Sequence, residues 1–212
     1  VSHTASLAGS DAGAESLLKR LGIARVPDVP SFLETLKLMH VCGQLEHPTL
    51  ATISCSGGEA SLAADTAHGT NVSYPALTDT QKTNLRTALG AMVALANPLD
   101  YHTYIWRDTA AMAAAWGAMM ESHLALTLLI VDFPRVDRCT DSDWDCAIDA
   151  AALAKTQTGA TAAMVATLPE NLSESIANRL IEKGVIPLSG LAAAIQAIQA
   201  ASSFTNPAQA PV

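Results

Sequence analysis

Apolar residues beyond position 48 form short uninterrupted runs that alternate with longer segments of helical period. Such runs are apolar on both faces, as expected for strands that helices cover from both sides. Five strands are predicted, over residues 49–56, 72–77, 124–134, 162–169 and 185–190. Their alternation with helices of roughly ten to seventeen residues indicates a parallel sheet.

Helix signals fill the segments between these runs. A turn and helix are predicted after the first strand, and Thr78 or Asp79 is a good cap for the helix after the second. Helices are predicted over residues 57–69, 78–90, 106–122, 142–159, 172–184 and 191–201. This order predicts an α/β protein with a flavodoxin-like, doubly wound, parallel five-stranded sheet.

A partial α/β unit precedes that sheet. Ser10 and Asp11 are good caps for a first helix that ends at Gly22, and residues 23–26 are predicted to form a short strand. A second helix begins at Asp28 and ends at Gly43. We therefore predict three regions: a remnant of a preceding domain over 1–43, a complete domain over 44–203, and a linker or tail over 204–212.

Charge and composition exclude several classes of protein. The formal net charge is −8 and only 15% of residues are charged, which argues against nucleic acid as a partner. No apolar run approaches the roughly 18 residues of a membrane span, and no signal-peptide pattern opens the chain. Four irregularly spaced cysteines indicate reduced thiols rather than a metal site. These features predict a cytoplasmic protein.

The turn after the first predicted domain strand, "SCSGGEAS", is a candidate anion site. Ser56, Gly57 and Gly58 let the backbone approach a ligand closely, and the helix that follows presents free N–H groups. A phosphate fits this pattern. Two glycines at a strand–helix turn are also common for turn geometry alone, so both interpretations stay open.

A second loop, "ANPLDYHTYIW", gathers polar side chains from Asn97, Asp100, His102 and Thr103. Pro98 and Asp100 favour a rigid turn rather than a helix or a central strand. From spacing alone, an ordinary capped loop with His102 as a hydrogen-bonded surface residue is the favoured interpretation.

The segments "SHTASLAGSD", "LGIARVPDV", "ISCSGGEASLAAD" and "NPLDYHT" resemble, in that order, the NDP-forming acyl-CoA synthetases of the succinyl-CoA synthetase superfamily. The resemblance covers nearly the whole chain. It implies that residues 1–43 end one flavodoxin-like domain and that a second follows. It also implies partners, namely the CoA-binding and ATP-grasp domains or subunits of the same enzyme, and an oligomer when the enzyme is intact.

The resemblance gives His3 a catalytic role, because His3 matches the histidine that this family phosphorylates during turnover. An acid, CoA and a nucleoside triphosphate then react through an acyl phosphate, with His3 carrying the phosphoryl group. A neutral imidazole nitrogen is a good nucleophile near neutral pH, which suits that role. CoA and ATP with Mg²⁺ are substrates of the intact enzyme, and neither is expected to bind this chain alone.

The same resemblance implies that backbone N–H groups near Ser56, Gly57, Gly58 and Glu59 hold the phosphate. Glu59 departs from the proline that many relatives have there, and a carboxylate at this position could cap the helix or reshape the acyl pocket. Asn97, Asp100 and His102 match a loop close to the acyl-phosphate site and are predicted to position substrate. This chain by itself is expected to be inactive.

A different class of function is also compatible with these residues. The same architecture serves as a catalytically silent module that senses an acyl-CoA or another ligand. Retention of His3 favours the enzyme. A flavin-binding or receiver-like domain is disfavoured, because the hydroxyl-rich flavin phosphate loop and the aspartate cluster of those classes are absent from the sequence.

Overall fold

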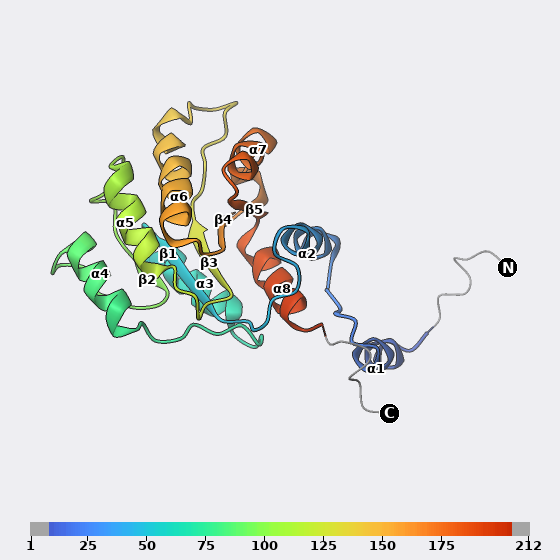
Figure 1. Cartoon of the computed structure of the whole chain (residues 1–212). Helices are drawn as coiled ribbons and strands as arrows, with labels where there is room; N and C mark the ends of the chain where they lie inside the picture. The colour runs from blue at the N-terminus through green and yellow to red at the C-terminus, as the bar shows by residue number, and fades with distance from the viewer. Residues whose placement is uncertain (1–8, 205–212) are drawn as a thin grey trace.

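A five-stranded, all-parallel sheet forms the centre of the computed structural model, which describes residues 9–204 (Figure 1). The strands lie in the order β2-β1-β3-β4-β5, which is the predicted flavodoxin-like order. Their bounds are Leu50–Ser54 for β1, Leu99–Asp100 for β2, Leu126–Ile130 for β3, Ala162–Ala166 for β4 and Ile186–Ser189 for β5. The predicted fold class is confirmed.

Helices cover both faces of the sheet because alternate residues of each strand are apolar on opposite faces. The helices are α1 (Asp11–Arg20), α2 (Val29–Cys42), α3 (Gly57–Ala67), α4 (Asp79–Leu89), α5 (Thr109–Met119), α6 (Asp145–Thr158), α7 (Glu174–Glu182) and α8 (Leu191–Ser202). In β4, Ala162, Met164 and Ala166 belong to the core under α4, α5, α6 and α7. Ala163 and Val165 belong to the core under α2, α3 and α8.

Two predicted strands are wrong. Residues 72–77 contribute only an isolated bridge between Ser73 and Thr49, because Pro75 has no N–H to donate to a ladder. Residues 23–26 lie outside every strand of the described chain, and Arg25 instead forms ion pairs with Asp11 and Glu15 of α1. The sheet still has five strands, because β2 forms at Leu99–Asp100, within the loop that the sequence predicts to be a rigid turn.

The outer edge of β1 is completed by three different groups in succession. At its start, the Leu50 N–H donates to the Ser73 carbonyl at 2.9 Å. Next, the Asn97 side chain accepts from the Thr52 N–H at 3.2 Å and donates to the Leu50 carbonyl at 2.8 Å. Only the last residues of β1 pair with β2. A two-residue strand is therefore enough, because backbone and side-chain groups satisfy the rest of the edge.

Helix α2 packs on the five-stranded sheet and its helices, where it contacts α8 and β5. Glu34 is buried in that contact, where its carboxylate accepts from the Ser189 N–H at 3.2 Å and pairs with Lys37. By contrast, α1 has no buried residue. Within residues 9–204, none of the helices has the length and apolarity needed to cross a membrane. The boundary proposed at residue 43 stays a prediction.

Candidate functional site

The candidate site lies where the order of the strands reverses. The chain leaves β1 toward β2 on one side and then returns to β3 on the other, so the carboxyl ends of β1 and β3 are neighbours at a switch point. Ligands of doubly wound sheets bind at this position. Helix α3 begins directly after β1, which aims its amino end at the same region.

The amino end of α3 has the features of an anion site. Ser56 is the N-cap, and its hydroxyl accepts from the Gly58 N–H at 3.2 Å. Within the described chain, the backbone N–H groups of Gly57 and Glu59 have no hydrogen-bond acceptor. These two donors, at the positive end of the helix dipole, are free to bind an anion.

A cavity of about 500 Å³ opens beside this helix end. Its lining comes from the turn after β1, the loop after β2, the end of β3 and the segment that leads into α6. The lining residues are Cys55, Glu59, Thr103, Trp106, Arg107, Ile130, Val131, Asp132 and Trp144. The two tryptophans meet edge to face, with ring centroids 5.9 Å apart. The cavity therefore combines apolar and aromatic walls with a few polar groups, as small-molecule sites do.

Glu59 is the electrostatically unusual group in this cavity. Burial, followed by the negative charges of Asp132 and Asp100, raises its pKa to about 7. Its Oε2 atom is buried without a hydrogen-bond partner in the described chain. Asp132 differs, because both of its oxygens accept from Thr167, from the N–H at 2.8 Å and from the hydroxyl at 2.5 Å. Of the two carboxyls in the lining, Glu59 is therefore the one with an oxygen that lacks a hydrogen bond.

Cys55 lines the same cavity but is a poor nucleophile. Burial raises the pKa of its thiol to about 11, and the nearby Glu59 carboxylate contributes to the increase. The thiol form therefore dominates near neutral pH, and the thiolate is the reactive form.

Asp100 lies next to the start of α3, and His102 lies beside Asp100. A Cβ atom on Gly57 would stand 3.3 Å from the Asp100 carboxylate, which places that carboxylate near the start of α3. Asp100 accepts from the His102 N–H at 2.8 Å, and the His102 ring nitrogen lies 3.7 Å from its other oxygen. His102 has a φ of 61°, so its backbone adopts the left-handed conformation.

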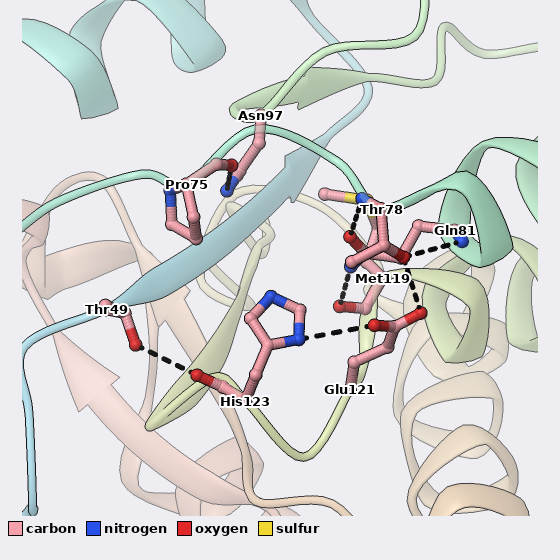
Figure 2. Close-up of polar contacts among 8 residues, drawn as sticks. All are labelled: Thr49, Pro75, Thr78, Gln81, Asn97, Met119, Glu121 and His123. Carbon is pink, nitrogen blue, oxygen red and sulfur yellow. Dashed lines mark hydrogen bonds and ion pairs between the residues drawn. The ribbon is translucent and has the colours of Figure 1, made fainter.

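Asn97 does not join the other predicted site residues. Its side chain contacts the first half of β1, and it also donates to the Pro75 carbonyl at 3.0 Å (Figure 2). All of these bonds lie away from the carboxyl ends of the strands. Asn97 therefore completes the edge of the sheet. His3 lies outside the described residues, so its predicted role stays a prediction.

The sequence-based expectations missed three of the groups that shape the cavity, namely Trp106, Asp132 and Trp144. Asp132 carried a usable signal, because it follows directly after the apolar run of β3 and so must stand at the carboxyl end of a strand. The sequence gives no comparable signal for Trp106 and Trp144, since the two residues are far apart in the chain and meet only when the sheet has formed.

Comparison with known proteins gives similarity at the level of structure. No family model and no curated protein matches the chain. A crystal structure of PH0766 from Pyrococcus horikoshii OT3 is similar with a TM-score of 0.74 and 16% identity, over 92% of this chain and 44% of that one. Acetyl-coenzyme A synthetase 1 (dinucleotide forming) from Ca. Korarchaeum cryptofilum in its apo form is similar with a TM-score of 0.71 and 18% identity, over 97% of this chain and 43% of that one.

The same synthetase in complex with phosphate and ADP gives a TM-score of 0.71 and 18% identity, over 98% of this chain and 43% of that one. The chain thus spans less than half the length of the structures that it resembles. Two of these structures are acetyl-coenzyme A synthetases, in agreement with the resemblance found in the sequence motifs. The chain has the α/β fold of the corresponding region of these synthetases.

Proposed function

We propose that this chain is part of an NDP-forming acid–CoA ligase, in which CoA-binding and ATP-grasp domains supply the remaining sites. The observation that carries the proposal is the amino end of α3, where two free N–H groups lie beside an open cavity at the switch point of the sheet. The structural similarity to acetyl-coenzyme A synthetases supports it.

In the proposed reaction His3 takes a phosphoryl group from ATP and releases ADP. The carboxylate of the acid then attacks that phosphorus, which frees His3 and yields an acyl phosphate, and the CoA thiol finally displaces phosphate to give the thioester. The N–H groups of Gly57 and Glu59 would stabilise the phosphoryl oxygens during both transfers. The cavity would hold the carbon chain of the acid.

Three further features belong to the proposal. Asp100 would position the substrate from its place beside Gly57, and His102 would assist through its contact with Asp100. The isolated chain is expected to be inactive, because the CoA and nucleotide sites would lie on the other domains. A cytoplasmic location is supported by the four free cysteines of the described chain.

The direct test uses the longer protein that carries this chain. The protein is incubated with γ-labelled ATP and Mg²⁺, and acid-labile, alkali-stable protein phosphate is measured for the wild type, His3→Asn and His68→Asn. His68 is a matched control, since it is an exposed histidine at the carboxyl end of α3. We expect label in the wild type and His68→Asn, and none in His3→Asn.

Label that persists in His3→Asn would refute the phosphohistidine. If the folded wild type takes up no label, the catalytically silent ligand-sensing module replaces the ligase. Discharge of the label by a carboxylic acid and CoA, with formation of a thioester, would complete the case for the enzyme.

A further inference from the structure

The cavity beside α3 has a distinctive charge balance. Glu59 and Asp132 line it, and Asp100 is close enough to raise the pKa of Glu59. The single cation in the lining is Arg107, and its guanidinium is paired with Asp143. The cavity therefore presents negative charge without an uncommitted positive group in the described lining.

Its walls favour a particular kind of positive charge. Trp106 and Trp144 lie on one side, with Ile130 and Val131 at the end of β3. Aromatic faces next to a carboxylate attract ammonium groups, above all those that carry methyl groups, because the ring quadrupole and the apolar contact both contribute. A small hydrated metal ion needs several oxygen ligands, and no cluster of three such side chains is found within residues 9–204.

One carboxylate oxygen beside the cavity lacks a hydrogen-bond partner in the described chain. Glu59 Oε2 is buried, yet it has no hydrogen-bond partner in the described chain. A buried carboxylate oxygen without a donor is costly, and a positive charge in the adjoining cavity offsets part of that cost electrostatically. Glu59 also stands in the first turn of α3, so such a ligand would lie within one helical turn of the free N–H groups.

We infer that the cavity selects a zwitterionic acid, with a carboxylate at one end and a cationic nitrogen at the other. The carboxylate would lie at the amino end of α3, and the nitrogen would enter the cavity between Glu59 and the two tryptophans. Glu59 then determines the specificity of the reaction. This inference rests on the proposed function and names its substrate class.

Two other classes of acid fit the cavity less well. A dicarboxylate would place its second negative charge beside Glu59 and Asp132, and Arg107 is already paired with Asp143. A purely aliphatic acid would fill the apolar part but would bring no positive charge to the Glu59 carboxylate. The test therefore compares both classes of acid with the zwitterionic acid.

The test compares three acids of the same chain length on the 212-residue chain by calorimetry. They are trimethylammoniobutanoate, its carbon isostere with a tert-butyl group in place of the trimethylammonium group, and a dicarboxylate with a second carboxylate in place of that group. The variants are Glu59→Gln, which keeps the shape of the side chain, and Trp106→Leu. Glu121→Gln is the matched control, because Glu121 is a carboxylate at the opposite end of the sheet whose oxygens already have partners.

We expect the wild type and Glu121→Gln to bind the cationic acid about tenfold more tightly than its carbon isostere. The preference should fall to about twofold or less in Glu59→Gln, and Trp106→Leu should weaken binding of the cationic acid. The indole N–H signals of Trp106 and Trp144 should shift in NMR spectra on binding, while that of the buried Trp116 stays in place.

Equal binding of the cationic acid and its isostere, tighter binding of the dicarboxylate, or no binding of the cationic acid at millimolar concentration would each overturn the inference. So would a preference that survives Glu59→Gln. The proposed function is tested separately, by the phosphohistidine experiment. A labelled His3 combined with no cationic preference would leave the ligase standing with another class of acid.

Discussion

The two ends of the parallel sheet treat polar side chains in opposite ways. At the amino end, Glu121 accepts from the Thr78 hydroxyl at 2.9 Å and pairs with His123 at 3.2 Å (Figure 2). Gln81, only 2% exposed, donates to the Met119 carbonyl at 3.0 Å and completes a capping box with Thr78. At the carboxyl end, Glu59 Oε2 and two amides of α3 lack partners in the described chain.

This difference separates polar groups that hold the fold from polar groups available to a ligand. A satisfied network stabilises the protein through bonds that are already made, whereas an unsatisfied buried group costs free energy until something binds. Both ends contain a carboxylate, a hydroxyl and a helix start, so residue type alone does not distinguish them. The state of their hydrogen bonds does.

The largest expected effect belongs to Asn97, which the sequence assigned to the site and the structure assigns to the sheet edge. Asn97→Ala removes three hydrogen bonds and leaves the Thr52 N–H and the Leu50 carbonyl without side-chain partners. We expect a loss of about 3 kcal/mol in the free energy of unfolding, measured with urea. Binding of acids to the folded variant should not change.

Asn97→Asp is the comparison for that experiment, since its carboxylate still accepts from Thr52 but would face the carbonyl oxygens of Leu50 and Pro75 with no hydrogen to donate. Because acceptors then meet at hydrogen-bond distance, a loss at least as large as that of Asn97→Ala is expected. If Asn97→Ala instead left stability intact and abolished binding, Asn97 would belong to the site after all.

A smaller effect distinguishes the start of α3 from an ordinary helix start. Ser56→Ala and Ser173→Ala each remove an N-cap hydroxyl, from α3 and α7 respectively, and each should cost about 1 kcal/mol. Inorganic phosphate should restore part of the loss only in Ser56→Ala, because a bound anion can accept from the N–H groups that the cap leaves behind. Urea unfolding with and without phosphate measures this. An equal response of the two variants would count against an anion site.

The smallest effect concerns the ionisation of Glu59. Its pKa in the folded chain is about 7 against 4.5 for the ordinary group, so folding favours the protonated form. That contribution to stability is complete below about pH 4.5 and is lost as the pH rises through about 7. Because the carboxyl is partly exposed, we expect a decrease of only about 0.5 kcal/mol.

The charges of Asp132 and Asp100 act on this carboxyl in the same direction as burial. Arg107 lines the same cavity and pairs with Asp143. Glu59→Gln should therefore remove the decrease between pH 5 and 8 that urea midpoints show for the wild type. An identical pH profile in the two proteins would mean that Glu59 is ionised throughout. A bound cationic acid should likewise reduce the decrease.

Sequence reasoning predicted the central strands and most helices because their signals are local. Residues 126–130 and 162–166 are continuous apolar runs, and Thr78 caps α4 as predicted. The second strand was misplaced because β2 has only two residues, and their pairing depends on where β1 already lies. A strand of two residues is too short to show an apolar run or an alternation of apolar and polar residues.

The candidate site was predictable in part for the same reason. Ser56, Gly57 and Gly58 follow one another in the chain, so their role as a helix start could be inferred from their order. The cavity could not, because Glu59 of α3 and the loop residues Trp106 and Asp132 come from three separate segments that converge only in the folded sheet. Asn97 shows the opposite error, since its neighbours in sequence contribute to the site and it does not.

The two borders of the sheet also affect how the protein behaves at high concentration. An open strand border recruits strands of other molecules and so begins aggregation. On one side the border strand β2 has only two residues, and on the other side β5 carries Pro187, which cannot donate to an incoming chain. The short strand and the proline thus protect this parallel sheet against self-association through its edges.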